Sequence, residues 1–327
     1  MNCRIDLYSG LLGCGKTSLI KQLLKTEYLD AKVAIIENEI GKINLDAEEL
    51  KCPEISITKI TNGCVCCTIQ GELTRSMELL IQTENPDYIV VEPTGAADIR
   101  SLLDTLARVK GASLRRCIMV VNAKKLLPLL TITGPFFKEQ IASASSIYMN
   151  FTDFMSEEEI VKTSEALWDI NPSLTIVKTP LDEVNAHTFT TIKECSVNVP
   201  NNTRHSGQKK NTSLKIVSLD NSNPAIIQVS HRNELILYTL TLEIKQRLTQ
   251  VQLNHLKEML SDAGNCEIWR AKGVITMMDG RKERLDFTFG DFFEKQIDSV
   301  MEEADGKIVL IGKKLNKRWL MEQLNNL

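Results

Sequence analysis

The sequence predicts an α/β protein with a mostly parallel sheet flanked by helices, followed by a smaller α+β C-terminal domain. From residue 3 to residue 180, short apolar runs alternate with longer helical patterns, which is typical of a parallel sheet covered by helices. The stretch 197–213 is polar and has almost nothing to bury, so it is typical of a linker. Beyond it, strands run together before and after helices, which indicates an α+β arrangement. We therefore expect one domain at 1–196 and a second at 214–327, joined by the linker 197–213.

The elements of the first domain follow from apolar patterns and boundary signals. The best-defined helix runs from 156 to 169, because Ser156 can cap it, glutamates fill its first turn, and Asn171-Pro172 stops it. The expected strands are 4–8, 32–36, 55–60, 88–92, 117–121, 147–150 and 174–177. The other expected helices are 16–24, 71–82, 99–108 and 136–144.

The second domain is expected to contain more strands than helices. Its strands are predicted at 214–219, 226–229, 235–244, 267–277, 284–289 and 307–311. Its helices are predicted at 249–262 and 317–324. This part of the sequence shows no catalytic constellation.

The composition excludes several classes of protein. The chain has 327 residues, 39 Lys and Arg against 42 Asp and Glu, and a formal net charge of -3. This balance gives no reason to expect nucleic acid or a membrane surface as a partner. No secretory signal opens the sequence, and no stretch approaches the roughly 20 apolar residues of a membrane span. Nine cysteines, three of them within four positions, argue against a disulfide framework and favour a reduced, cytoplasmic compartment.

A phosphate-binding loop is the clearest motif. Residues 10–17, GLLGCGKT, fit the pattern GxxxxGK[ST] and lie between the first predicted strand and the first predicted helix. Glycines let the backbone turn its N–H groups toward phosphate oxygens, and the helix N-terminus adds partial positive charge. Lys16 can reach the terminal phosphates, and the Thr17 hydroxyl can ligate Mg²⁺. The residues expected to bind the nucleotide here are Gly10, Gly13, Cys14, Gly15, Lys16, Thr17 and Ser18.

A second signal follows at the end of the strand predicted at 88–92. Glu92 closes this strand, and Gly95 follows closely behind it. A carboxylate there can hold the Mg²⁺ shell or orient water, and the glycine can sense the γ-phosphate. Four apolar residues and a glutamate also occur by chance in many sheets. The catalytic candidates are therefore Lys16, Thr17 and Glu92, and no general base stands out beyond Glu92.

The segment Asn150-Phe151-Thr152-Asp153 indicates which base is bound. The Asp153 carboxylate can accept from both N1–H and the 2-amino group of guanine, whereas adenine lacks this pair of donors. Phe151 stands where guanine-binding hydrolases usually carry a lysine, and it could stack on the base instead. The alternative is a strand-end turn in which Asn150 and Asp153 bond the backbone. Guanine is favoured, and ATP remains an alternative if Asp153 does not face the base.

Cys64, Cys66 and Cys67 form a cluster in a predicted loop, NGCVCC. Three thiolates can converge on one soft ion, and tetrahedral zinc needs about four ligands at ~2.3 Å. The open fourth position suits a carrier that must release its metal. Cobalt(II) and copper(I) also accept such ligands, so the motif alone does not select the metal. A buried turn of small residues and a redox pair are the alternatives.

Together these residues resemble the CobW-like P-loop GTPases, relatives of the urease and hydrogenase maturation GTPases. The resemblance covers nearly the whole chain, because the C-terminal segments WRAKGVI and IVLIGKKL also match the pattern of that family's accessory domain. The segments that carry it in the first domain are GLLGCGKTS, IENEIGKINLD, NGCVCC and VVEPTG.

The resemblance implies binding of Mg²⁺ and GTP, slow GTP hydrolysis, and a transition-metal site on the Cys-x-Cys-Cys motif, mainly for zinc or cobalt. It implies a metallochaperone that serves a client metalloprotein or a cobalamin or other metal-cofactor pathway. By the same resemblance, Glu37, Glu39 and Asp46 lie in or at the end of the first switch and could approach the metal or Mg²⁺. The residues it assigns to phosphate and Mg²⁺ are Gly13, Gly15, Lys16 and Thr17; those it assigns to metal are Cys64, Cys66 and Cys67; and those it assigns to guanine are Asn150 and Asp153.

Three positions depart from the family pattern. Lys42 stands where many relatives have an acid after the glycine of the first switch, so a carboxylate metal ligand is lost. Asn122 stands where relatives often carry aspartate, and Phe151 replaces the usual lysine. These differences favour a divergent subgroup with its own metal or client.

Two further functions compete with that of a GTP-dependent metal carrier. One is an assembly factor that senses metal and docks on a client without donating the ion, and the other is a hydrolase that senses redox state with its neighbouring thiols. The strands of the C-terminal domain could contact the client, a second copy in a homodimer, or the GTPase domain of the same chain.

Overall fold

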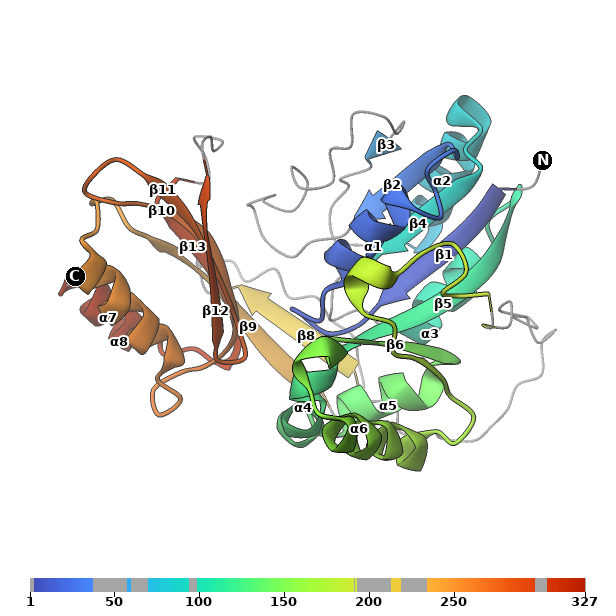
Figure 1. Ribbon diagram of the computed structural model, residues 1–327. Helices are drawn as coiled ribbons and strands as arrows, with labels where there is room; N and C mark the ends of the chain where they lie inside the picture. Colours follow the sequence, from blue (N-terminus) through green and yellow to red (C-terminus); the bar gives the residue numbers. More distant parts are fainter. Residues whose placement is uncertain are drawn as a thin grey trace. The chain divides into compact units, whose positions relative to one another are not determined.

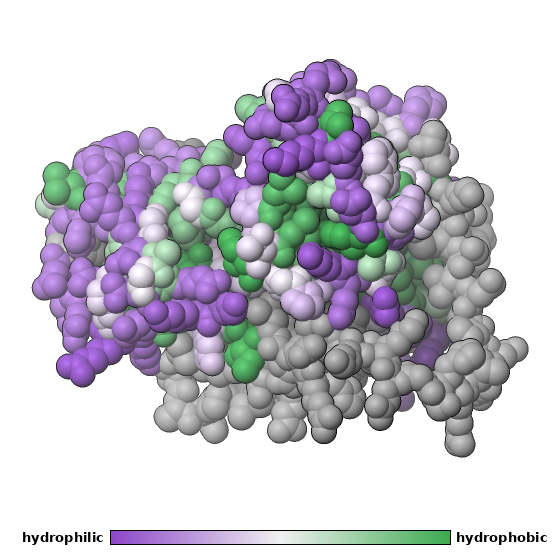
Figure 2. Space-filling model, turned by 90° about the horizontal axis from the view of Figure 1, so that it is seen from below, coloured by the Kyte–Doolittle hydropathy of each residue, from purple (hydrophilic) through white to green (hydrophobic). Residues whose placement is uncertain are grey.

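The computed structural model describes residues 3–37, 58–59, 70–93, 99–190, 192, 213–218, 234–297 and 305–326. Its contacts divide the chain into two compact units (Figure 1); apart from short segments, one ends at Ser213 and the other begins at Leu214. Except for Ser213, the linker predicted at 197–213 lies outside the described residues. None of the helices described is long and apolar enough to cross a membrane. Where residues are described, the face shown in Figure 2 is mainly hydrophilic, with apolar residues in smaller groups.

The first unit is built on a parallel sheet. Its described strands number seven and follow the order β3-β2-β4-β1-β5-β6-β7. All of the neighbouring pairs run parallel, so the carboxyl ends of the strands lie at one edge, where ligands bind in such sheets. The strands are β1 (Cys3–Ser9), β2 (Val33–Glu37), β3 (Thr58–Lys59), β4 (Tyr88–Glu92), β5 (Ala112–Asn122), β6 (Ser146–Asn150) and β7 (Thr175–Val177).

Helices cover both faces of this sheet (Figure 1). Alternation along β1 assigns the faces: Ile5 and Leu7 join the core with α2 and α3, whereas Tyr8 joins the core with α1. The helices are α1 (Lys16–Lys25), α2 (Gln70–Glu84), α3 (Ile99–Leu106), α4 (Leu126–Ile132), α5 (Pro135–Ser143) and α6 (Glu157–Ile170), with short 3-10 turns η1 (Ala123–Lys125), η2 (Thr152–Phe154) and η3 (Leu181–Glu183).

Local signals explain where these elements begin. Ser156 caps α6 in a capping box with Glu159, which confirms the predicted start of that helix. Two features differ from the prediction. β5 begins at Ala112 rather than at residue 117, because Arg115 and Arg116 interrupt its apolar pattern yet are paired inside the fold. α4 was not predicted, since its sequence LLPLLTI is too short and too uniformly apolar to show a period.

The second unit is an antiparallel sheet with helices packed on it. Its described strands follow the order β12-β11-β10-β13-β9-β8. Helices α7 (Gln250–Ser261) and α8 (Lys317–Asn325) share one apolar core with β9, β10, β11 and β13. The strands are β8 (Ser213–Ser218), β9 (Glu234–Glu243), β10 (Glu267–Thr276), β11 (Lys282–Thr288), β12 (Asp291–Ile297) and β13 (Lys307–Lys314).

The predicted fold class, a mostly parallel α/β domain with a smaller α+β domain, is confirmed. The strand predicted at 226–229 lies outside the described residues. β12 was not predicted, and it follows β11 through the two-residue loop Phe289-Gly290, in which both residues have positive φ angles of 46° and 93°. Two positive φ angles are the geometry of a tight hairpin, but phenylalanine is not a usual signal for it.

Candidate nucleotide-binding site

The phosphate loop lies between Ser9, the last residue of β1, and Lys16, the first residue of α1. Gly10 has φ +139°, and a Cβ there would lie 2.1 Å from the Val120 carbonyl oxygen. Gly15 has φ +92°, and a Cβ there would lie 2.1 Å from the Asn150 amide nitrogen. Both positions therefore require glycine, because space and backbone conformation exclude a side chain.

Lys16 brings a positive charge into this loop. Its side chain is buried, and the amine donates to the carbonyl oxygens of Gly10 at 3.0 Å and Leu11 at 3.3 Å. These acceptors are neutral, so they do not compensate the charge of the amine. A polyanionic ligand held by the loop and the N-terminus of α1 would compensate it.

Thr17 and Glu92 meet at the carboxyl edge of the sheet. The Thr17 hydroxyl donates to Glu92 Oε1 at 2.9 Å, which joins the first turn of α1 to the end of β4. Glu37, at the end of β2, pairs in register with Glu92, so two acidic positions close neighbouring strands. Hydroxyl and carboxylate oxygens are the ligands that Mg²⁺ prefers, so this donor set fits a magnesium ion bound with phosphate.

Asn150 and Asp153 lie at the end of β6, next to the loop. The Asn150 side chain is buried and donates to the Cys14 carbonyl at 3.0 Å, so it fixes the loop. Phe151 has φ +65°, and its ring lies beside Gly15. Asp153 lies on η2 with an exposed side chain. The structure thus brings Asn150 and Phe151 to the phosphate loop, and Asp153 follows two residues later on η2.

Cys14 is packed inside the loop. Its side chain is 2% exposed, and burial raises the pKa of the thiol above its usual value of 9.0. The thiol therefore stays protonated at neutral pH, which disfavours a reactive role. Ser18 lies exposed in the first turn of α1.

Several predicted site residues lie outside the described part of the chain. The strand β2 includes Glu37, but the description does not extend to its side chain. Among the described residues, no group of three His, Cys, Asp or Glu side chains could hold a metal ion. The predicted positions that lie outside the description are Glu39, Asp46, Cys64, Cys66, Cys67 and Gly95.

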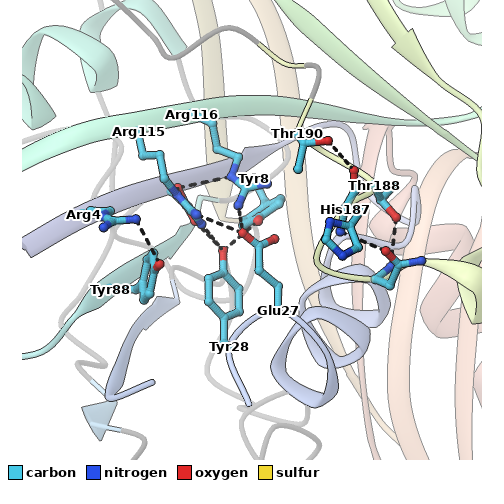
Figure 3. Close-up of polar contacts among 12 residues, drawn as sticks. Arg4, Tyr8, Glu27, Tyr28, Tyr88, Arg115, Arg116, His187, Thr188 and Thr190 are labelled. Carbon is cyan, nitrogen blue, oxygen red and sulfur yellow. Dashed lines mark hydrogen bonds and ion pairs between the residues drawn. The ribbon is translucent and has the colours of Figure 1, made fainter. Parts of the chain in front are cut away.

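Sequence reasoning missed a polar group inside the same unit, the Asp6 cluster (Figure 3). The Asp6 side chain is fully buried and accepts hydrogen bonds from Tyr28 and Arg115. Figure 3 labels the other members, Tyr8, Glu27, Tyr28, Arg115 and Arg116. The Tyr8 and Tyr28 hydroxyls lie 2.8 Å apart, and burial raises the pKa of both. The members of the cluster are Asp6, Tyr8, Glu27, Tyr28, Arg115 and Arg116.

Two arginines complete the Asp6 cluster. Glu27 Oε1 pairs with Arg115 Nη1 at 2.9 Å and also with Arg116. Arg116 Nε lies 3.5 Å from Asp6 Oδ1. Charged residues within otherwise apolar strands were the available signal, since Asp6 interrupts β1 and the arginines interrupt β5.

A comparison with known families supports the prediction drawn from these motifs. The family model described as CobW/HypB/UreG, nucleotide-binding domain, matches residues 5–178. The chain belongs to the CobW/HypB/UreG family. That match begins in β1 and ends just past β7, so it includes the phosphate loop, Glu92 and the segment from Asn150 to Asp153.

Curated relatives in this family carry zinc in their names. The chain is 28% identical to the zinc chaperone YeiR of Escherichia coli (strain K12) over 158 residues, which are 47% of this chain and 48% of YeiR. It is 23% identical to the zinc-regulated GTPase metalloprotein activator 1 of Schizosaccharomyces pombe, over 96% of this chain and 83% of that protein. The match to YeiR thus spans about half of that relative's length.

A solved structure of a further protein is similar over the whole chain. It is the crystal structure of the Zn(II)-bound YjiA GTPase from E. coli, with 18% sequence identity and a TM-score of 0.41. The similarity covers 100% of this chain and 99% of that one.

Proposed function

We propose that this protein is a GTPase that carries a transition metal ion, zinc or cobalt, to a client. It binds GTP and Mg²⁺ on the loop 10–17 and hydrolyses GTP. Cys64, Cys66 and Cys67 hold the metal ion, which passes to a client metalloprotein or a metal-cofactor pathway. The observation that carries this proposal is the contact of the Thr17 hydroxyl with Glu92 at 2.9 Å, beside the buried Lys16.

Each residue of this contact has a role in the proposal. Lys16 binds the terminal phosphates, and Thr17 belongs to the Mg²⁺ shell. Glu92 holds the same shell or orients the attacking water. Bound Mg²⁺ supplies charge neutralisation as the phosphoryl group is transferred.

The position of the cysteines in the sequence suggests how the nucleotide acts on the metal. They lie between β2 and β4, whose last residues Glu37 and Glu92 pair in register. GTP and Mg²⁺ bound at this edge would order both flanks of the cysteine segment and bring the thiolates together, and hydrolysis would release them. Affinity for metal and affinity for nucleotide must then be coupled reciprocally. The zinc chaperones among the relatives support zinc as the first ion to test.

The nucleotide part of the proposal is tested by the Mg²⁺ dependence of GTP hydrolysis. Thr17→Ala should raise the Mg²⁺ concentration needed for half-maximal hydrolysis about tenfold or more, because one ligand oxygen is lost. Thr17→Ser keeps the hydroxyl and is the matched control. If the alanine variant needed the same Mg²⁺ concentration as the wild type, Thr17 would not ligate the ion.

The metal part is tested by competitive zinc and cobalt titration of reduced, anaerobic protein. It is run with Mg²⁺ and a non-hydrolysable GTP analogue, then with GDP. We expect one metal ion per chain, bound at least roughly tenfold more tightly with the analogue. Cys66→Ser should abolish this binding, and Cys195→Ser, outside the motif, should keep it. Equal affinity in both nucleotide states would rule out gating, and failure of an apo client to take up the metal would favour the assembly factor.

A further inference from the structure

Strand β12 lies at one edge of the second sheet. Among the described strands it has a single neighbour, β11. Most of its residues are exposed, and Phe293 is 65% exposed. A strand edge with an exposed aromatic residue is a template for pairing with another strand.

One face of the strand packs against the core and α7 of its own unit. Phe292 packs against the core, with its ring centroid 4.7 Å from that of Phe287. Glu294 forms an ion pair with Lys257 of α7. Because side chains alternate, these contacts fix Phe293 on the opposite face, together with Asp291 and Lys295.

The hairpin geometry determines which backbone groups face the open edge. A two-residue loop closes the hairpin at the pair Thr288 and Asp291. Hydrogen-bonded pairs in an antiparallel ladder recur at every second residue, so Asp291, Phe293 and Lys295 bond to β11. Phe292 and Glu294 therefore direct their N–H and C=O groups away from β11.

The edge is complementary to itself. When a twofold axis passes through Phe293 in an antiparallel pair, Phe293 of one copy lies opposite Phe293 of the other, and each Asp291 lies opposite a Lys295. Aromatic pairs and opposite charges in these positions are favourable. An axis through Glu294 or Lys295 would instead place like charges opposite each other, which is unfavourable.

We propose that β12 pairs with β12 of a second copy of this chain, in the register centred on Phe293. Phe292 and Glu294 exchange backbone hydrogen bonds across the junction, and the two sheets become continuous. The contact is small, so the dimer is weak and forms at high protein concentration. This inference is independent of the proposed GTPase and metal functions.

The first test is sedimentation velocity of the full chain over a range of concentrations. The wild type should dimerise reversibly. Lys295→Glu puts a second acid opposite Asp291 at both ends of the junction and should raise the dissociation constant of the dimer about tenfold. Asp291→Lys combined with Lys295→Glu restores opposite charges and should restore the dimer. Lys313→Glu makes the same charge change at another exposed lysine and should leave it intact. A wild type that is monomeric at all concentrations, or a Lys295→Glu variant that dimerises as the wild type does, would overturn the proposal.

A second test depends on geometry rather than on affinity. In the proposed register the two Phe293 Cα atoms form a non-hydrogen-bonded pair, about 4.5 Å apart, which is within the range of a disulfide. Phe293→Cys should cross-link to itself under mild oxidation, as mapped by peptide mass spectrometry. Lys295→Cys should not, because it faces Asp291. Cross-linking of the 295 variant without the 293 variant would refute the register.

Discussion

The phosphate loop and the Asp6 cluster lie at opposite ends of helix α1 and use buried charge in opposite ways. Lys16, the first residue of α1, donates to two neutral carbonyl oxygens. Glu27 lies just past the C-cap residue Thr26 of the same helix. The Asp6 cluster to which it belongs contains two carboxylates and two guanidinium groups in mutual contact. The charges of the cluster therefore cancel within the cluster, whereas neither of these two partners of Lys16 carries a charge.

This difference distinguishes a loop suited to binding an anion from a cluster that stabilises the fold. A buried amine with neutral partners gains most when an anion arrives, because the ligand supplies the opposite charge. A cluster whose charges are already compensated gains little from a ligand. It joins β1, β5 and the end of α1, and its loss should affect folding rather than nucleotide binding.

Removing one acid from the Asp6 cluster is expected to give the largest effect. Asp6→Asn leaves two guanidinium groups with a single carboxylate in a buried site, so the free energy of unfolding should fall by about 3–5 kcal/mol. Urea denaturation followed by circular dichroism measures this change. Asp30→Asn, at an exposed position, should change it by less than about 0.5 kcal/mol. If both variants were equally stable, the cluster would not hold the fold together.

Lys16→Ala tests the other half of the comparison. The rate of GTP hydrolysis should fall by about 10²–10³, because a preorganised positive charge at the phosphates is lost. The free energy of unfolding should fall by less in Lys16→Ala than in Asp6→Asn. Phosphate release and urea denaturation measure the two quantities on the same preparation. Lys25→Ala, at the exposed last turn of α1, is the control and should hydrolyse GTP at the wild-type rate.

The two regions also differ in how far the sequence predicted them. The strand–loop–helix arrangement around residues 10–17 was predicted and is confirmed, because contiguous glycines, a lysine and a threonine between a strand and a helix carry a local signal. That the loop binds phosphate stays a prediction. The Asp6 cluster was not predicted, since its members come from β1, β5 and the end of α1 and meet only in the folded chain. Because Arg115 and Arg116 interrupt the apolar pattern, the predicted strand began at residue 117 instead of Ala112.

The second unit shows the same limit. The helix predicted at 249–262 is confirmed as α7, and the structure adds that Thr249 caps it in a capping box with Gln252. β12 was missed because its hairpin uses Phe289-Gly290 instead of the usual Asn-Gly or Asp-Gly. The metal site stays a prediction, because Cys64, Cys66 and Cys67 lie outside the described residues.

Asp153→Asn examines the site at the base rather than at the phosphates. Loss of a charged acceptor for N1–H and the 2-amino group should weaken GTP binding about 10–100-fold. Xanthosine triphosphate carries an oxygen in place of the 2-amino group, so the new amide can donate to it and binding should recover. Competition against a fluorescent nucleotide measures all three affinities, including that of ATP. A variant with wild-type preference for GTP would show that Asp153 does not face the base.

The smallest effect is expected from the tyrosines of the Asp6 cluster at alkaline pH. Burial raises the pKa of Tyr8 well above its usual value of 10.0, so the folded protein keeps the proton that the unfolded chain loses. The corresponding stability is present below pH 10 and is lost as the pH rises from there toward the folded-state pKa. Tyr8→Phe removes this dependence, so between pH 8 and pH 10 the variant should lose about 0.4 kcal/mol less than the wild type. Urea denaturation at the two pH values measures the difference, and parallel losses in both proteins would mean that Tyr8 ionises as readily in the folded cluster as in the unfolded chain.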